Sequence, residues 1–455
     1  MTVSEHLAEY VLSVKEKQLP EKQINIARTF FIDAMACMFL GASSDSVKRA
    51  MGFVKEYAGP GKSIFPGPKP MAMDSAHCAM LCAMAAHSND FDDMSASLNG
   101  HPSALIVPVV FSLGQKLGSG GKELLRAYIA GVETDAILGQ AFRELGYRKG
   151  VNPTNFIGIF GAVAAAGLLL GLDGEGMANA LGIAANEATG FKANFGTRAK
   201  DLAIGMSALK AVACAECASH GIDSSRDALE GPFGLFESIC GDSGAELLHR
   251  LIEEHGSEFI DPGMIMKPYP SCRGNHSGIG CITKIVEKHK FGLEDVEQII
   301  CRVDEAAYDT DRYEYPSNPG EAKFSLAFCI AKVIECGKVS IDDFIGDEIL
   351  DKKPMELIDR VKIVCVPELF ENSRFGTEVE VRLTDGSVFT EKECYAKGDP
   401  LYPMTEEEVG QKLKDCLSRI ATPEKALEGA RLLSRLEDLK NAGEIIDFLY
   451  SERKR

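Results

Sequence analysis

The chain has 455 residues, which is long enough to build more than one hydrophobic core. Lys and Arg number 49 against 67 Asp and Glu, giving a net charge of -18 at pH 7. This acidic balance argues against a nucleic-acid or anionic-membrane surface. An anionic substrate is still possible, because a few lysines in one cleft can reverse the potential locally.

The N-terminal stretch MTVSEHLAEYVLSVKEKQLPEK is typical of an amphipathic helix and lacks the features of a secretory signal. The richest apolar stretch, Gly158 to Leu172, is broken by glycines and falls short of the about 20 residues that cross a bilayer. The fourteen cysteines are spread out and are expected to be reduced thiols. We therefore expect a cytoplasmic protein with no membrane and no nucleic-acid partner.

Apolar residues recur at helical spacing through most of the chain up to residue 255. The predicted helices span 4–17, 22–41, 45–57, 74–88, 103–117, 122–145, 156–170, 175–187, 199–220 and 243–255. Ala and Gly dominate from 156 to 220, and small side chains let helices approach closely. This part is therefore predicted to be the centre of a helical bundle.

The pattern changes near Gly263. Strands are predicted at VEQIICRVDEA, VKIVCV and TEVEVRL, with helices at 275–290 and 321–336, and Asp385-Gly386 is a hairpin signal. Helices return after Pro403, at 405–420, 423–436 and 442–452. The sequence thus predicts a mainly α protein, in which a large all-helical domain (1–263 and 401–455) carries an inserted, smaller α+β domain (264–400).

The common nucleotide, zincin and hydrolase motifs are absent, so candidate chemistry has to be sought in polar clusters. The first cluster is HSNDFDDMSASLNGH, residues 87–101, which combines two imidazoles with three carboxylates after an apolar helix. Carboxylate and imidazole are the usual groups for moving protons on and off carbon. The alternative is a solvated helix end, with His101 capping the next helix.

A second cluster contains Arg198 and Lys200 at the start of a long helix. The helix dipole disfavours cations there, so these side chains suggest an external anion such as a substrate carboxylate. A surface ion pair with Asp201 explains them equally well.

A third cluster, MKPYPSCRGNH at 266–276, coincides with the predicted domain junction, where ligands often bind. It carries Lys267, Cys272, Arg273 and His276. Cys272 could be a nucleophile or a small buried residue, since no local pattern marks its pKa as lowered. Further on, Tyr308 could donate a hydrogen bond to a substrate or pack between the domains.

Several of these segments together resemble the MmgE/PrpD family: HSNDFDD with GHPSA downstream, AAAGLLLGLD, TRAKDLAIG, KPYPSCRGNHSG and NPGEAKFSLAFCIA. The resemblance spans most of the chain. It implies a homodimeric enzyme without cofactor or metal, built from an all-helical domain and an α+β lid. It places Asp90, His101, Lys200, Lys267 and, less closely, Tyr308 on active-site positions.

The chain departs from the family pattern at GVNPTNFIG, where Asn152 stands at a position that many members fill with His. Asn cannot carry a proton or a positive charge as imidazole does. Met94 replaces a Thr of the decarboxylases, which disfavours that activity. Asn152 is therefore counted among candidate substrate-binding residues, together with Arg198, Cys272, Arg273 and His276.

The activities that the resemblance implies share reaction at a carbon next to a carboxylate. Such chemistry needs a base and cations that stabilise an enolate-like charge. We predict that Lys200 and Lys267, with Arg273 as a further candidate, bind substrate carboxylates. His101 and Asp90 are expected to handle the proton, and Tyr308 to assist the leaving group. Dehydration of a small hydroxy-tricarboxylate such as 2-methylcitrate is the first expectation. Epimerisation of a dicarboxylate resembling iminodisuccinate, cis-aconitate decarboxylation and a non-catalytic scaffold are the alternatives.

Overall fold

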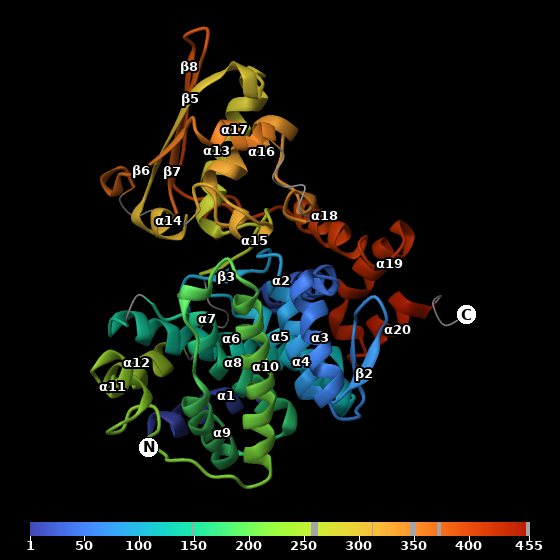
Figure 1. The fold of residues 1–455 in the computed structure, drawn as a ribbon. Coiled ribbons are helices and arrows are strands. Elements are labelled where there is room, and N and C mark those ends of the chain that lie inside the picture. The colour runs from blue at the N-terminus through green and yellow to red at the C-terminus, as the bar shows by residue number, and fades with distance from the viewer. Residues whose placement is uncertain (148–149, 256–262, 312, 346–351, 371–374, 452–455) are drawn as a thin grey trace.

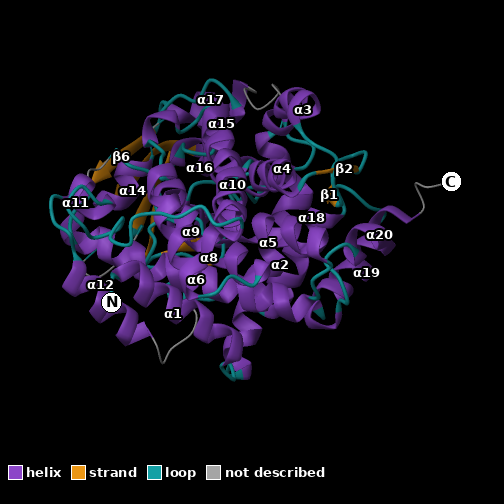
Figure 2. Cartoon of the chain, turned by 90° about the horizontal axis from the view of Figure 1, so that it is seen from below, coloured by secondary structure: helices purple, strands orange, loops and turns teal. Residues whose placement is uncertain are grey.

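The structure is a computed structural model that describes the whole chain except residues 148–149, 256–262, 312, 346–351, 371–374 and 452–455. The fold is mainly α, as predicted (Figure 1). Figure 2 shows helices making up the bulk of the chain. A region that is nearly all helical lies below, and a region built on a sheet lies above it in Figure 1.

The helical region contains fifteen of the described α-helices and two short strand pairs. Its helices are α1 (Val3–Glu16), α2 (Glu21–Gly41), α3 (Asp45–Tyr57), α4 (Ser75–His87), α5 (Ser103–Leu117), α6 (Gly121–Glu144), α7 (Pro153–Phe156), α8 (Gly158–Leu170), α9 (Gly174–Glu187), α10 (Arg198–Ser219), α11 (Leu235–Cys240), α12 (Ala245–His255), α18 (Glu406–Leu417), α19 (Pro423–Leu433) and α20 (Glu444–Tyr450). Its strands are β1 (Ser63–Phe65), β2 (Met71–Met73), β3 (Met94–Ser95) and β4 (Met264–Ile265).

Helix α4 lies at the centre of this region, packed against α2, α5 and α10. Small residues allow the close approach. A Cβ atom on Gly205 of α10 would lie 2.5 Å from Met84 Cγ, and one on Gly41 of α2 would lie 1.9 Å from the Ala85 carbonyl oxygen. Both contacts are closer than Cβ atoms tolerate, so glycine is required. The packing fixes the start of α10 next to the end of α4.

The α/β region holds a four-stranded sheet in the order β6-β5-β7-β8. Strand β5 (Val296–Val303) runs parallel to β6 (Val361–Cys365) and antiparallel to β7 (Thr377–Leu383), which pairs with β8 (Val388–Glu393). The predicted hairpin at Asp385-Gly386 is confirmed, and Gly386 takes the positive φ of 89° that favours glycine. The helices of this region are α13 (His276–His289), α14 (Glu305–Thr310), α15 (Pro319–Ala322), α16 (Leu326–Cys336) and α17 (Lys352–Ile358).

The two regions have separate hydrophobic cores. Two stretches join them. The first stretch contains β4, which pairs with β3 of the helical region, with Met94 opposite Ile265. The second contains Gly398, whose carbonyl accepts from the Met266 amide at 3.0 Å. The stretch that enters the α/β region and the stretch that leaves it therefore lie side by side. The domain boundaries proposed at 263/264 and 400/401 remain predictions.

The expectation that no helical stretch is long and apolar enough to cross a membrane is wrong by length and composition. Helix α2, the stretch 153–170 and α10 meet both criteria. Within the fold they are packing elements, and the stretch 153–170 has 89% of its most apolar window buried. The corresponding windows of α2 and α10 are 67% and 50% buried, so packing in the bundle accounts for only part of the apolar character of α10.

Candidate active site

A turn at residues 88–91 follows α4 and forms the centre of the site. Helix α4 ends at His87, with Ser88 as its C-cap, and the Asp90 amide donates to the His87 carbonyl at 3.0 Å. Asp90 has a φ of 52°, in the left-handed region that Asp tolerates better than most side chains. A non-glycine residue in this conformation often marks a functional turn.

Lysines from three distant segments donate to the carbonyl groups of this turn. Lys323 Nζ lies 2.7 Å from the Ser88 oxygen, Lys267 Nζ 3.1 Å from the Asp90 oxygen, and Lys412 Nζ 2.8 Å from the Phe91 oxygen. Of these, only the Ser88 carbonyl belongs to the C-cap of α4, at the negative end of the helix dipole, where cations are favoured. The turn after α4 gathers the other two ammonium groups through its own carbonyls.

The Asp90 carboxylate is bound by two further lysine contacts. Lys200 Nζ is 2.8 Å from Oδ1, and Lys267 Nζ is 3.4 Å from Oδ2, with all three side chains buried. Burial alone would raise the pKa of Asp90, but the ammonium groups of Lys200 and Lys267 hold it well below its ordinary value. The two ion pairs therefore favour the ionised form of the Asp90 carboxylate.

The secondary structure explains how these lysines arrive. Lys200 lies in the first turn of α10, which the close packing on α4 brings to the turn. Lys267 follows β4, whose pairing with β3 sets its position. A cation at a helix N-terminus is disfavoured by the dipole, but the paired Asp90 compensates. Burial lowers the pKa of Lys200, and Asp90 reverses this, so that its pKa is raised.

His101 lies beside this group and is linked to His87 through Asp92. Both imidazoles approach the same carboxylate oxygen, at 2.8 Å from His87 Nδ1 and 3.2 Å from His101 Nδ1, and their ring centroids are 4.8 Å apart. Asp92 is fully buried. Burial would raise its pKa, but the two imidazoles hold it well below its ordinary value. Asp92 orients both rings.

The tautomer of His101 follows from its neighbours. Its Nδ1 lies 2.6 Å from the Asp93 carbonyl oxygen, which can only accept a hydrogen bond. Nδ1 must therefore carry the proton, which leaves Nε2 as the basic nitrogen. Burial lowers the pKa of His101, against the opposing charge of Asp92. This direction favours the neutral imidazole, with Nε2 unprotonated.

His87, Asp92 and His101 also have ligand atoms within 4.8 Å of one another, close enough to hold a metal ion. The donor types would suit a first-row transition metal. Their present contacts are those of hydrogen bonds, in which Asp92 accepts from both imidazoles.

The structure places two residues of the 266–276 cluster as internal supports of the α/β region. Arg273 donates to the carbonyls of Ala396 and Lys397 at 2.9 and 2.8 Å. His276 Nε2 lies 3.2 Å from the Ser271 carbonyl, and burial, together with Arg273, lowers its pKa well below the ordinary value.

Cys272 is buried near the lysines, and burial raises the pKa of its thiol, with Asp90 adding to the effect. A thiol that stays protonated is a poor nucleophile. The geometry therefore favours the reading of Cys272 as a small buried residue that packs beside the site.

Three other predicted residues stand apart from the cluster. Arg198 is exposed and forms an ion pair with Asp45 of α3, whereas Lys200, two residues later, points at Asp90. Tyr308 on α14 is half exposed.

Asn152 is buried and caps α7. Its Oδ1 accepts a hydrogen bond from the Thr154 amide at 3.3 Å, and the Thr154 hydroxyl accepts one from the His101 amide at 3.2 Å. Asn152 is thus connected to His101 through Thr154.

Sequence reasoning missed Lys323, which lies in the NPGEAKFS segment after α15 and reaches Ser88. Burial lowers its pKa to about 8. The available signal was a lysine just before the apolar run FSLAFCIA, where a solvated cation is out of place. It also missed that Asp92 holds both imidazoles.

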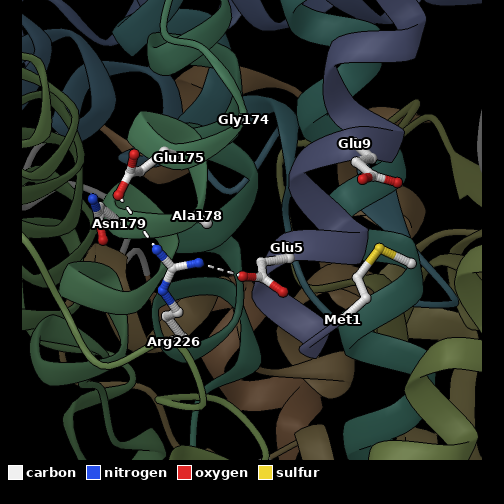
Figure 3. Close-up of a pocket in the computed structure, with 8 residues that line it drawn as sticks. All are labelled: Met1, Glu5, Glu9, Gly174, Glu175, Ala178, Asn179 and Arg226. Atoms are coloured by element: carbon white, nitrogen blue, oxygen red, sulfur yellow. Dashed lines mark hydrogen bonds and ion pairs between the residues drawn. The ribbon is translucent and has the colours of Figure 1, made fainter.

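Two surface hollows lie away from this cluster. The one in Figure 3, of about 360 Å³, lies between α1 and α9, and its Arg226 is bound to Glu5 at 2.7 Å and Glu175 at 3.4 Å. The other, of about 840 Å³, lies between α2 and the two joining stretches. Neither is lined by Asp90, His101 or the lysines that surround them.

Comparison with known proteins gives two family matches, the MmgE/PrpD N-terminal domain over residues 5–248 and the MmgE/PrpD C-terminal domain over residues 269–438. The chain is 24% identical to the cis-aconitate decarboxylase of Mus musculus, over 97% of this chain and 92% of that protein. It is 23% identical to the human cis-aconitate decarboxylase (98% and 94%) and 22% identical to that of Aspergillus terreus strain NIH 2624 (98% and 96%). Both matches together cover most of the chain, which therefore belongs to the MmgE/PrpD family.

Proposed function

We propose that this protein is a lyase that acts on a small di- or tricarboxylate, at a carbon next to a carboxylate, without a cofactor. The observation that carries the proposal is the buried Asp90, bound by Lys200 and Lys267 beside a neutral His101. Cations fixed next to a base are what an enolate-like intermediate requires.

The lysines of the cluster support an anionic substrate. Lys200 and Lys267 share one carboxylate, Asp90, and Lys323 has no carboxylate within ion-pair distance among the described residues. Asp92 adds a second negative charge, and Asp201 attracts Lys200 and Lys323 from further away. Lysines that share or lack a close counter-ion can bind substrate carboxylates, which agrees with a small di- or tricarboxylate.

His101 acts as the base in this proposal. Its Nε2 accepts the proton from the carbon next to a substrate carboxylate, while Asp92 and the Asp93 carbonyl hold the ring. The negative charge that develops is spread onto the carboxylate and stabilised by the lysines. Asp90 keeps the lysines in place and takes no proton.

The reaction we propose is dehydration of a hydroxy-tricarboxylate such as 2-methylcitrate. The C–H bond breaks with its proton passing to His101, and the C–O bond breaks on the neighbouring carbon. The hydroxyl leaves as water after taking up that proton from His101, which returns to its neutral form. The product is an unsaturated tricarboxylate. The replacement of the decarboxylase Thr by Met94 favours this assignment over decarboxylation.

Decarboxylation of a cis-aconitate-like acid is the second candidate, and the names of the relatives, which match along nearly the whole chain, favour it. In this reaction the bond from carbon to a carboxylate breaks, CO2 leaves, and the carbon takes up a proton. The same lysines would stabilise the carbanion, so the two reactions differ in the leaving group.

Access to the site requires movement, because Lys267 and Asp90 are 1% and 3% exposed. Lys323 belongs to the α/β region, and Lys267 lies on the stretch that leads into it. Asp90, His101 and Lys200 belong to the helical region. We propose that the α/β region acts as a lid that opens for the substrate and closes to exclude water.

The test is to incubate the purified protein with 2-methylcitrate, citrate and cis-aconitate, following unsaturated-acid absorbance, CO2 release and proton exchange from deuterated water. Alkene formation from 2-methylcitrate supports dehydration, and CO2 from cis-aconitate identifies the second candidate. Exchange without net product would indicate an epimerase or isomerase. If the wild type shows no turnover and no proton exchange on any di- or tricarboxylate, and His101→Asn does not differ from it, the proposed function is wrong. The result would then favour the non-catalytic scaffold.

A further inference from the structure

Lys323 differs from the other lysines at the turn in having no carboxylate partner. Its side chain is buried, with the residue 8% exposed, and its Nζ donates to the Ser88 oxygen at 2.7 Å. Lys200 and Lys267 are paired with Asp90, and Lys412 is paired with Asp33 at 2.7 Å. Among the described residues, no carboxylate oxygen lies within 4 Å of the Lys323 ammonium group.

An ammonium group in this position is costly. It has three N–H donors and one acceptor among the described residues, and burial without a counter-ion disfavours its charged form. Burial lowers its pKa to about 8. Asp201, Asp90 and Asp92 attract the charge from beyond ion-pair distance and Lys200 repels it. Buried charged groups with perturbed pKa values cluster at functional sites, where a ligand can complete their contacts.

The neighbours of Lys323 show that it faces the same site as Lys200. Phe324, the next residue, has its ring centroid 5.2 Å from Lys200 Nζ, and the neighbouring ring of Phe195 lies 5.8 Å from the same atom. Tyr313 donates to the Phe195 carbonyl at 3.0 Å. The segment before α16 is thereby fixed over the start of α10, with the Lys323 side chain directed to the end of α4.

We propose that Lys323 is a substrate-binding residue of the α/β region, whose ammonium group pairs with a carboxylate that neither Lys200 nor Lys267 holds, and that substrate binding is therefore coupled to proton uptake. The inference rests on the proposed function, since it takes the ligand to be a polycarboxylate. It adds the residue and the protonation step. Because Lys323 reaches across to Ser88, a ligand held by it would also hold the two regions together.

The direction of the pH effect follows from the pKa of about 8 in the empty site. A bound carboxylate favours the ammonium form and raises this pKa. At pH 8 about half of the free protein carries a neutral amine at Lys323, so binding takes up about half a proton. Uptake should vanish below pH 6.5, where Lys323 is already charged, and affinity should fall as the pH rises above 8.

The experiment is titration calorimetry of the full chain with tricarballylate, a saturated tricarboxylate without a leaving hydroxyl. Measurement at pH 8 in phosphate and in Tris, whose ionisation enthalpies differ, gives the number of protons taken up. The variants are Lys323→Met, Lys323→Arg and, as matched control, Lys332→Met, whose lysine lies on α16 and pairs with Glu335 at 2.7 Å.

We expect the wild type and Lys332→Met to take up about half a proton. Lys323→Met should bind roughly 10- to 100-fold more weakly without uptake, because a hydrogen bond to a charged group is lost. Lys323→Arg should bind within about 10-fold of the wild type without uptake, because guanidinium stays charged. Thermal unfolding without ligand checks that Lys323→Met is folded, and its midpoint should not fall, since an unpaired buried charge is removed.

Two outcomes overturn the inference in distinguishable ways. Tight binding by the wild type without proton uptake would overturn the coupling to protonation, and unchanged affinity in Lys323→Met would remove Lys323 from the site; both would leave the proposed function standing. Failure of the wild type to bind tricarballylate, citrate or cis-aconitate would overturn the proposed function together with it.

Discussion

The Nζ atom of Lys200 lies 2.8 Å from Oδ1 of Asp90, although 110 positions separate the two residues. The pair links the start of α10 to the end of α4, and both residues are nearly inaccessible to water. Asp90 is thereby kept ionised, and it holds Lys200 and Lys267 on either side of its carboxylate. Because these ion pairs favour the ionised carboxylate, the proposed function assigns the proton transfer to His101.

Replacement of Lys200 tests this pair. Lys200→Met should lower kcat/KM by roughly 100-fold or more, because a preorganised charge that stabilises the transition state is lost. The control is Lys210→Met on the same helix, whose lysine pairs with Glu187 at 3.0 Å on a partly exposed face and should change kcat/KM less than about twofold. Steady-state kinetics on the substrate found by the screen measures both. Equal effects of the two substitutions would contradict the assignment.

Asp92→Asn tests whether Asp92 positions His101. An amide cannot supply the negative charge that raises the pKa of His101 against burial, so this pKa should fall further. His101 is the base when neutral, and activity therefore rises with pH through its pKa, below the ordinary value of 6.5. The acid limb of the kcat/KM profile should lie below pH 6.5 in the wild type and at still lower pH in Asp92→Asn, with kcat reduced more than KM is changed. An unshifted acid limb would contradict the role.

Much of the fold could be predicted from the sequence, because most helices carry a regular apolar spacing. The predicted helix 103–117 matches α5, and 45–57 matches α3. The strand pairs β1–β2 and β3–β4 were not predicted, since strands of two or three residues have no periodicity and are fixed by their partners. Helix α14 was not predicted either, because its six residues are too few to show a helical apolar spacing.

The site could be predicted in part. Four residues that the family resemblance singled out, Asp90, His101, Lys200 and Lys267, are brought together by the fold. Their roles were not readable from the sequence, because the acid and base assignment depends on which groups Asp90 and Asp92 contact. Lys323 escaped notice for a related reason: its interest lies in a missing counter-ion, which is a property of the packed structure.

Arg198→Ala tests one sequence-based candidate. The guanidinium is exposed and bound to Asp45, so its removal should change KM and kcat less than about twofold. Arg226→Ala serves as control for loss of a surface arginine, because it also pairs with exposed carboxylates, in the hollow remote from the site. An increase in KM of about tenfold or more for Arg198→Ala alone would mean that Arg198 leaves Asp45 to bind the substrate.

Removal of metal ions tests the reading of His87, Asp92 and His101 as a hydrogen-bonded group. Protein dialysed against a chelator should keep its activity, and addition of Zn²⁺, Mn²⁺ or Fe²⁺ under anaerobic conditions should not raise it, because both Nδ1 atoms are engaged with Asp92. Elemental analysis of the protein before dialysis completes the test. Loss of activity on dialysis that one metal restores, and that His87→Asn abolishes, would establish a metal centre instead.

The buried pair of Lys412 and Asp33 should carry much of the stability around the turn. Lys412 on α18 donates to Asp33 on α2 and to the Phe91 carbonyl, and its ammonium lies 4.0 Å from the Phe91 ring centroid. Lys412→Met leaves a buried carboxylate without its cation, which costs about 3–5 kcal/mol. Burial already raises the pKa of Asp33, and loss of the opposing lysine should raise it further.

The sign of the pH effect distinguishes this mechanism from a general packing defect. A folded-state pKa above the unfolded value gives stability that is present at low pH and lost as the pH rises through the folded pKa. The deficit of Lys412→Met should therefore shrink toward pH 5 and grow toward pH 8 in urea unfolding. Asp33→Asn in the Lys412→Met background should recover part of the lost stability, because the neutral amide removes the unpaired charge. A deficit that is independent of pH and unrelieved by Asp33→Asn would show that lost packing against Phe91, rather than the ion pair, is responsible.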